Sequence, residues 1–274
     1  MRSMLTSLLV FAGVAGAIYA VLCVYLFLQQ DRILFYPGPN DPALLEEWRS
    51  HRVTISSEDH LLEGWWAENP ASATSAVLIY FGGNAEDVLY TANTARRFAA
   101  RRTLVVNYRG YGQSPGQPSQ AALYRDALAI YDYVVQTGAA IPTDIVVMGR
   151  SLGSGLATLL AAQRQVGGAI LLTPYGSIAE VAASHYPMFP VRLLLRHPFD
   201  STELAKQTDV PAIFIAAEHD RVIPPVHARR LFDQWSGPKS FHVLPGVGHN
   251  DLEWHPEYYE LINAFLRKRI ADGG

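Results

Sequence analysis

The stretch Ile145-Val-Val-Met-Gly-Arg-Ser-Leu-Gly153 joins an apolar run to a serine that lies between two glycines. The small side chains that follow, from Leu152 to Ala162, are typical of a closely packed helix. A strand, a sharp turn and a helix in this order form a nucleophile elbow, whose strained turn projects the serine hydroxyl from the sheet. Side chains at the two flanking glycines would collide with the neighbouring strand and helix. The stretch therefore predicts Ser151 as a nucleophile, with an ordinary glycine-rich turn as the alternative.

The same alternation of strand and helix signals extends over most of the chain. Short apolar runs rich in β-branched residues are typical of strands that are buried on both faces of a parallel sheet. Such runs occupy 76–81, 103–107, 145–148, 169–172 and 212–217. Helix-like stretches occupy 87–100, 119–136, 152–164 and 225–235, and a last strand and helix occupy 241–244 and 256–270. This pattern predicts an α/β fold, a mostly parallel central sheet with helices on both faces.

Two antiparallel strands are expected ahead of the parallel part, at 52–57 and 61–67, because a tight polar turn joins them. No linker or repeat divides the chain after residue 32, so residues 33–274 are expected to form one domain. Within this domain, residues 178–206 are too short for a full lid but contain two apolar clusters. We expect them to form a small cap over a ligand pocket, with simple core packing as the equal alternative. A cap of this kind would favour a substrate with an acyl or other hydrophobic portion.

Residues 8–28 contain no charged side chain and lie in a longer uncharged stretch bounded by Arg2 and Asp31. A helix of these 21 residues would be about 31 Å long, which matches the ~30 Å hydrocarbon core of a bilayer. The sequence therefore predicts a single-pass membrane anchor over residues 1–32. A cleaved signal peptide and a buried core helix are the alternatives. Arg2 and the amino terminus, set against Arg32 at the other end, favour a domain on the non-cytoplasmic side.

Composition excludes several classes of protein. The 274 residues are 49% hydrophobic and 17% charged, as in a folded globular protein. A formal net charge of −3 gives no electrostatic attraction to a polyanion, so nucleic-acid binding is not expected. The one cysteine, Cys23, permits neither a disulfide within the chain nor a cysteine cluster for structural zinc.

A serine nucleophile needs a base that accepts its proton and an acid that orients the base. His249 follows the last predicted strand in a glycine-rich loop, which allows the backbone to aim the imidazole back across the sheet edge. Asp220 follows the strand at 212–217 and is the expected acid, with Glu218 as the alternative. Asp251, beside the histidine, is expected to cap the last helix. The chain order serine, aspartate, histidine is the order of α/β-hydrolases.

Acyl transfer also needs backbone donors near the oxygen that becomes negative during attack. The NH of Leu152, the residue after the nucleophile, is one expected donor. The loop that follows the strand at 76–81 contains Gly82 and Gly83, which permit a close approach, and the NH of Asn84 is the expected second donor. A phosphate-binding turn is the alternative, but no Gly-x-Gly-x-x-Gly or Gly-Lys-Ser/Thr pattern accompanies this loop.

Six motifs in order resemble those of the Bem46-like α/β-hydrolases, which are related to the membrane-associated ABHD serine hydrolases. They are Tyr80-Phe-Gly-Gly-Asn-Ala, Asn107-Tyr-Arg-Gly-Tyr-Gly-Gln-Ser-Pro-Gly, Gly149-Arg-Ser-Leu-Gly, His185-Tyr-Pro with Phe199-Asp-Ser, His219-Asp-Arg-Val-Ile-Pro and Gly248-His-Asn-Asp. The resemblance covers the chain from about Ile33 to the C-terminus. It implies Ser151 as nucleophile, Asp220 as acid and His249 as base.

The chain departs from this family at one position. Members usually have His-Gly-Asn-Ala where this chain has Gly82-Gly-Asn-Ala85. Loss of the imidazole predicts a looser oxyanion loop or a larger pocket. The resemblance implies an esterase, a thioesterase, or a hydrolase of lipids or acylated proteins.

These observations together predict a membrane-anchored serine hydrolase. It is expected to cleave an acyl ester or thioester of a small-molecule or lipid-like substrate through an acyl-enzyme, with no metal and no organic cofactor. A serine peptidase of the same fold and a non-catalytic membrane-tethered scaffold are the alternatives.

Overall fold

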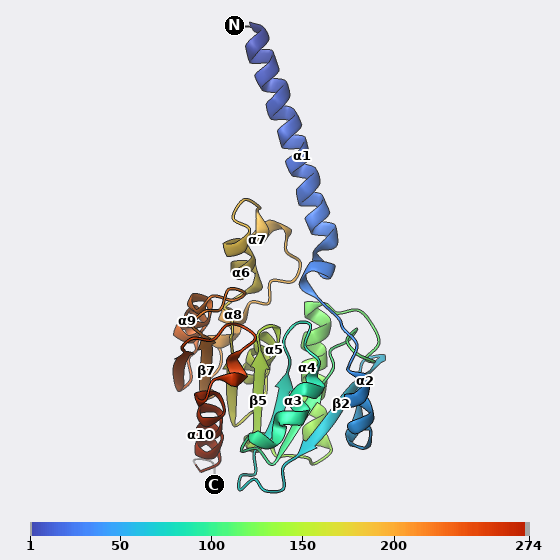
Figure 1. Ribbon diagram of the computed structural model, residues 1–274, viewed down its shortest axis with the longest axis vertical. Helices are drawn as coiled ribbons and strands as arrows, with labels where there is room; N and C mark the ends of the chain where they lie inside the picture. Colours follow the sequence, from blue (N-terminus) through green and yellow to red (C-terminus); the bar gives the residue numbers. More distant parts are fainter. Residues whose placement is uncertain (1, 272–274) are drawn as a thin grey trace.

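The computed structural model describes residues 2–271 as a long helix that projects from an α/β domain (Figure 1). This helix, α1 (Arg2–Leu34), has 33 residues and is therefore about 50 Å long. Within the described residues it is the one helix long and apolar enough to cross a membrane, and its most apolar window is 0% buried. The expectation of a long apolar helix is confirmed, and the alternative of a buried core helix is wrong.

Eight strands form one sheet in the order β1-β2-β4-β3-β5-β6-β7-β8. They are β1 (Arg52–Ser57), β2 (His60–Glu68), β3 (Val77–Phe81), β4 (Arg102–Val106), β5 (Ile145–Arg150), β6 (Gly168–Leu172), β7 (Ala212–Ala217) and β8 (Lys239–Leu244). The pairs β1/β2 and β2/β4 are antiparallel, and all other pairs are parallel. The predicted fold, a mostly parallel sheet preceded by an antiparallel pair, is confirmed.

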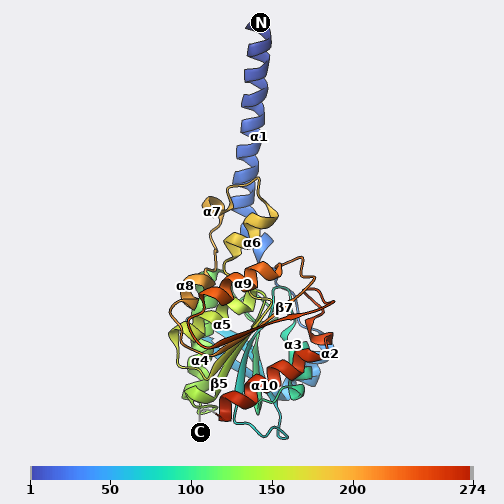
Figure 2. The ribbon, with the colours of Figure 1, turned by 90° about the vertical axis from the view of Figure 1, so that its left-hand side faces the viewer.

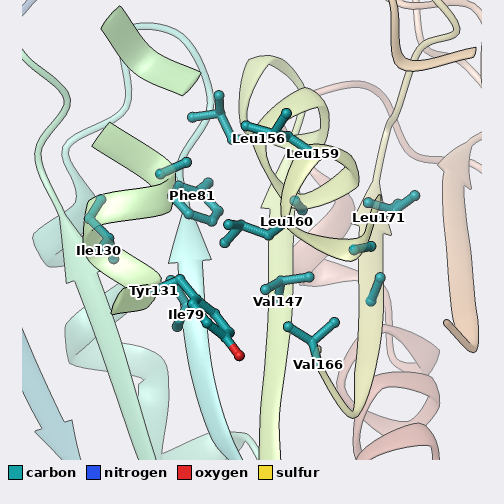
Figure 3. Close-up of a cluster of buried hydrophobic side chains, with 14 of the residues drawn as sticks. Ile79, Phe81, Ile130, Tyr131, Val147, Leu156, Leu159, Leu160, Val166 and Leu171 are labelled. Carbon is teal, nitrogen blue, oxygen red and sulfur yellow. The ribbon is translucent and has the colours of Figure 1, made fainter. Parts of the chain in front are cut away.

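Helices cover both faces of this sheet (Figures 1 and 2). The helices after α1 are α2 (Pro42–Glu47), α3 (Val88–Thr94), α4 (Gln120–Gln136), α5 (Leu152–Gln163), α6 (Ile178–His185), α7 (Val191–Leu194), α8 (Ser201–Ala205), α9 (Pro225–Gln234) and α10 (Glu257–Ala271). Of these, α6 and α7 stand beyond one edge of the sheet (Figure 1). Successive strand residues point to opposite faces, so each strand contributes to two cores. One core joins the sheet to α4, α5 and α9, and Figure 3 shows Phe81, Val147 and Leu160 in it. The other joins the sheet to α3 and α10.

One helix is shorter than its sequence predicts. The stretch 87–100 was expected to be a single helix, but α3 ends at Thr94 and a 3₁₀ turn, Ala95–Arg97, follows. Asn69 stabilises this tighter ending because its side-chain amide donates to the carbonyls of Arg96 and Phe98 at 3.2 and 2.9 Å. The chain is thereby turned toward the start of β4.

The segment 178–206 divides into two parts with different surroundings. Its end packs into the domain, where Phe199 and Ala205 are fully buried. Its beginning, with α6 and α7, stands above the edge of the sheet and beside the lower part of α1 (Figures 1 and 2). There the hydroxyl of Tyr19 donates to the carbonyl of Met188 at 2.7 Å, and the amide of Gln30 donates to that of Leu194 at 3.1 Å.

Candidate active site

The turn between β5 and α5 has the geometry of a nucleophile elbow. Ser151 has φ 49° and ψ −116°, a strained conformation for a residue with a side chain. A side chain at Gly149 would overlap the carbonyl of Gly153, and one at Gly153 would overlap the carbonyl of Phe81. Both glycines are therefore required by close backbone approach. The backbone NH of Ser151 donates to Leu172 of β6 at 2.9 Å, which fixes the turn against the sheet.

Three predicted site residues, which are far apart in the sequence, lie within hydrogen-bond distance of one another. His249 follows β8, and its Nε2 lies 3.0 Å from Oγ of Ser151. Its Nδ1 lies 2.7 Å from Oδ2 of Asp220, which follows β7. Because an ionised carboxylate can only accept, Nδ1 carries the proton and Nε2 is left to accept from the serine hydroxyl. All three loops leave the carboxyl ends of parallel strands, which meet at one edge of the sheet.

The carboxylate of Asp220 is held on its other side as well. Its Oδ1 accepts from the backbone NH groups of Val222 and Ile223 at 2.9 and 2.7 Å. The side chain of Asp220 is 1% exposed and that of His249 is 10% exposed. The carboxylate is thus fixed in one orientation, and it can hold the imidazole in one tautomer.

The rival carboxylates lie elsewhere. Glu218 accepts from the backbone NH of Gly246 at 2.9 Å, and its side chain is half exposed. The alternative of Glu218 as the partner of His249 is therefore wrong for this geometry. Asp251 does not cap the last helix, which begins at Glu257. A 3₁₀ turn, Leu252–Trp254, separates the two, and Asp251 makes no side-chain capping bond to it.

The predicted oxyanion loop lies against the nucleophile. A Cβ built on Gly83 would lie 3.8 Å from Cβ of Ser151. The NH of Gly83 is already used, because it donates to Oε2 of Glu86 at 2.7 Å. Asn84, the next residue, lines the same cleft as Ser151. Leu152 is the first residue of α5, so its NH has no acceptor within the helix.

Side-chain bonds hold this loop in place, so the expectation of a looser loop is not supported. The amide of Asn84 donates to the carbonyl of Leu34 at 2.7 Å. Its oxygen accepts from the backbone NH of Tyr36 at 2.9 Å and the hydroxyl of Tyr111 at 2.6 Å. No enlarged space remains at Gly82 either, because a Cβ there would lie 3.0 Å from Val88 and 3.3 Å from Glu86.

Glu86 and Arg150 join the oxyanion loop to the histidine loop, a connection that sequence reasoning missed. Oε2 of Glu86 accepts from Nη1 of Arg150 at 3.3 Å as well as from Gly83. Nη2 of Arg150 donates to the carbonyl of His249 at 3.2 Å and to Oδ1 of Asn250 at 3.1 Å. The side chains of Glu86 and Arg150 are only 12% and 21% exposed, respectively. The signal in the sequence was an arginine within the elbow and an acidic residue shortly after the glycine pair.

Burial and neighbouring charges shift the pKa values of Tyr80 and Arg150. Burial and then the adjacent Glu86 raise the pKa of Tyr80 well above its usual value, so its phenol stays protonated and donates to Glu86 at 2.7 Å. Burial lowers the pKa of Arg150, but the carboxylate of Glu86 and nearby acidic groups outweigh that effect and raise it overall. Arg150 therefore remains a charged donor at the edge of the cleft.

These residues line an open cleft of about 660 Å³. Its lining includes Ser151, His249 and Asn84 as well as Val222 and Glu253. The arrangement can transfer a proton from a serine hydroxyl to an imidazole and place backbone donors beside the serine.

Comparison with known proteins identifies relatives of this chain. The family model described as "Serine aminopeptidase, S33" matches residues 72–197. An uncharacterized protein of Mycobacterium tuberculosis, Rv2307c, is 31% identical over 88% of this chain and 88% of its own length. Protein bem46 of Schizosaccharomyces pombe is 26% identical over 97% of this chain and 95% of its own length.

A lipase and an esterase of known structure are also similar to this chain. Lysophosphatidylserine lipase ABHD12 of Danio rerio is 25% identical over 85% of this chain and 69% of its own length. The structure of the Pyrococcus furiosus esterase Pf2001 superposes with a TM-score of 0.66 at 16% identity, over 85% of this chain and 97% of the esterase. The superposition shows a shared fold. Together with the family match, these relatives indicate an esterase- or lipase-like α/β-hydrolase.

Proposed function

The chain belongs to the Bem46-like, ABHD-type α/β-hydrolases, and from that premise we propose that it is a membrane-anchored serine hydrolase that cleaves an acyl ester or thioester. The observation that carries the proposal is the unbroken line of hydrogen bonds from Asp220 through His249 to Ser151, with distances of 2.7 and 3.0 Å. A serine, an imidazole and a buried carboxylate in this order are the requirements for nucleophilic acyl transfer.

In this mechanism His249 takes the proton of Ser151 as the hydroxyl oxygen attacks the substrate carbonyl. The resulting imidazolium is stabilised by the carboxylate of Asp220, which stays ionised. His249 then gives the proton to the leaving alcohol or thiol, and the acyl group remains on Ser151. A water molecule, deprotonated by the same imidazole, releases the acyl group and restores the serine.

The tetrahedral intermediates carry negative charge on the former carbonyl oxygen. The backbone NH groups of Asn84 and Leu152 are the proposed donors to it. Each such donor contributes about 3 to 4 kcal/mol to transition-state stabilisation in known hydrolases. The fixed loop supports this role because donors that are already oriented need no reorganisation during the reaction.

The proposed substrate is a small molecule or lipid with an acyl portion. One relative is named as a lysophosphatidylserine lipase, and one protein of similar known structure is named as an esterase. Residues 178–206, with α6 and α7 beside α1, are proposed as a small cap at the side of the cleft. The carbonyl of Val222, a cleft residue, lies 3.0 Å from Nε2 of His185 at the end of α6.

The proposed anchor is residues 1–32 as a single-pass membrane helix, with residues 33–274 as the hydrolase domain. We place that domain on the non-cytoplasmic side because Arg2 and the amino terminus lie at the opposite end of the helix from it. Labelling of Ile141→Cys by a membrane-impermeant maleimide in intact cells tests this side, since Ile141 is 62% exposed. Labelling only after the cells are opened would reverse the assignment.

Hydrolysis of p-nitrophenyl butyrate by the full chain in detergent micelles tests the proposed function. Wild type should turn the ester over, and Ser151→Ala should lower kcat by at least about 10³-fold. Ser240→Ala is the matched control, since Ser240 is exposed at the amino end of β8. An active Ser151→Ala variant would overturn the assignment, and a wild type inactive on all esters and thioesters would favour a scaffold.

A serine peptidase is the second candidate, and the description of the matching family model favours it. Glu253 at the cleft adds weight, because an aminopeptidase needs a carboxylate near the substrate amine. Leucyl-p-nitroanilide and p-nitrophenyl butyrate compared at equal concentration separate the two. We expect the ester to react faster by at least about 10²-fold, which is 2.7 kcal/mol in barrier height. A faster anilide would favour the peptidase.

A further inference from the structure

A group of exposed apolar side chains lies at the tip of the segment between α6 and α7. Residues 186–194, the "α6–α7 tip", include Tyr186, Met188 and Leu193, which are 56%, 71% and 85% exposed. Exposed apolar side chains that are grouped on one surface can mark a site of contact with a protein or a membrane. The contacts of this tip with α1 identify the partner.

We propose that the α6–α7 tip is inserted into the hydrocarbon of the bilayer leaflet next to the domain, as a second membrane contact beside α1. The inference rests on the membrane anchor of the proposed function and deepens it. The occupant of the apolar surface is lipid acyl chain, and neither a second copy of the chain nor a folded-down lid is required.

The inference depends on the depth of Tyr19 in the membrane. The uncharged part of α1 runs from Ser3 to Gln30, and a spanning segment needs about 20 residues. The first possible segment is therefore 3–22 and the last is 11–30, so every choice contains Tyr19. This residue lies at hydrocarbon depth wherever the helix sits along the membrane normal.

The tip reaches this depth through direct contacts. The hydroxyl of Tyr19 donates to the carbonyl of Met188 at 2.7 Å, and its ring stacks on Phe189 with the centroids 5.9 Å apart. The ring of Phe189 and the carbonyl of Met188 are therefore in direct contact with a side chain of the part of α1 that lies at hydrocarbon depth.

Polar groups lie at the domain end of α1, as expected where the helix leaves the hydrocarbon and enters the headgroup region. Asp31 forms an ion pair with Arg196 at 2.9 Å and a hydrogen bond with Nε2 of His197 at 2.9 Å. Gln30 accepts from the backbone NH of Arg196 at 2.6 Å. The tip is apolar at Met188 and Phe189, next to Tyr19, and the charged groups Arg196 and Asp31 follow it at the end of α1.

Insertion would bring the cleft to the membrane surface. The α6–α7 tip continues from α6, whose last residue, His185, contacts Val222 at the cleft. An acyl substrate could then pass from the leaflet to Ser151 along α6 without crossing bulk water. This path names the substrate class more closely as an amphiphile that resides in the bilayer.

Nitroxide scanning of the full chain in vesicles of phosphatidylcholine and phosphatidylglycerol tests the insertion. In a Cys23→Ser background, spin labels are placed at Met188→Cys and Leu193→Cys. Phe11→Cys in α1 is the lipid control, and Ile141→Cys, exposed at the opposite end of the domain, is the water control. Power saturation compares collisions with oxygen, which is enriched in lipid, and with a water-soluble nickel chelate.

We expect the oxygen-to-nickel collision ratio at 188 to match that at 11, and the ratios at 188 and 193 both to exceed that at 141 at least fivefold. A ratio equal to that at 141 would overturn the insertion, and so would exclusion of both reagents, because protein would then cover the tip. A collision ratio at position 11 equal to that at 141 would show that α1 is not in the membrane, and the proposed anchor would then be wrong. The readout needs no turnover, so it is independent of the serine chemistry.

Discussion

Asp220 is proposed to orient His249, and its replacement tests that role with little change in the shape of the side chain. We predict that Asp220→Asn lowers kcat on p-nitrophenyl butyrate by about 10⁴-fold, because an amide can donate to Nδ1 and so favour the wrong tautomer. Glu218→Gln is the matched control, since Glu218 bonds to Gly246 and not to the histidine. Loss of activity in the control, or an Asp220→Asn variant within tenfold of wild type, would contradict the assignment.

Arg150 is predicted to be a positioning residue, since it touches both loops and no reacting atom. Arg150→Met should lower kcat about tenfold with little change in KM, which corresponds to the loss of about one net hydrogen bond. Arg150→Lys should recover part of kcat, because the charge next to Glu86 is kept. Arg164→Met removes an exposed ion pair with Asp132 and serves as the control. A larger effect on KM than on kcat would point to substrate binding instead.

Single residues could be predicted where one strand and its loop decide the outcome. Ser151 and Asp220 each follow a recognisable strand directly, and His249 lies in the glycine-rich loop after another, so strand order brings the three together. Glu86 and Arg150 could not be paired in advance. Their contact depends on how the loops after β3 and β5 pack, which no local pattern encodes.

At the scale of elements, the β5–α5 turn is the most constrained feature. We predict that Gly153→Ala destabilises the domain by more than about 3 kcal/mol, because the new methyl group would overlap the carbonyl of Phe81 and the backbone cannot move away cheaply. Thermal unfolding in micelles measures the effect. Gly38→Ala is the control, since a Cβ there meets nothing within 4 Å and its φ needs no glycine. Equal melting temperatures for the two variants would contradict the account.

Glu63 on β2 makes the stability of the antiparallel part depend on pH. Burial raises the pKa of this carboxyl, and Arg52 on β1 offsets the rise only in part. A folded-state pKa above the unfolded value gives stability that is complete below the unfolded pKa and is lost as pH rises through the folded pKa. Glu63→Gln should therefore melt higher than wild type at pH 7.5.

The difference should disappear at about pH 3, well below the ordinary pKa of a glutamate, where Glu63 is protonated in both states. Glu68→Gln is the matched control on the same strand, because its carboxylate is half exposed in its pair with Arg102. Thermal unfolding of the full chain in micelles at the two pH values checks both variants. A Glu63→Gln variant that melts lower than wild type at pH 7.5 would show that the pair with Arg52 outweighs the cost of burial.

Element type was predictable wherever hydrophobic periodicity was strong, as in all the buried strands. Element boundaries were less predictable, as the early end of α3 shows. There the side-chain amide of Asn69, from a distant part of the chain, stabilises a 3₁₀ turn. For residues 178–206, core packing is confirmed at the end of the segment, and the small cap over the pocket stays a prediction. The end of the segment packs into the core and its beginning meets α1.

At the scale of the whole molecule, the anchor, the α6–α7 tip and the oxyanion loop form one connected unit. Asn84 bonds to Leu34 at the end of α1, and Gln30 of the same helix bonds to Leu194. Hydropathy alone predicted the helix. Its contacts were not predictable, because they join segments more than 45 residues apart and depend on the direction in which α1 leaves the domain.

The central claim is that Ser151 is the nucleophile of a serine, histidine and aspartate relay. Reaction of the full chain in membranes with a fluorophosphonate, followed by digestion and mass spectrometry, locates the adduct directly. Wild type should carry the phosphonyl group on Ser151, and His249→Ala should carry at least about 10²-fold less after the same time, since the hydroxyl then lacks its base. An adduct on another residue, or equal labelling of Ser151 without His249, would contradict the account.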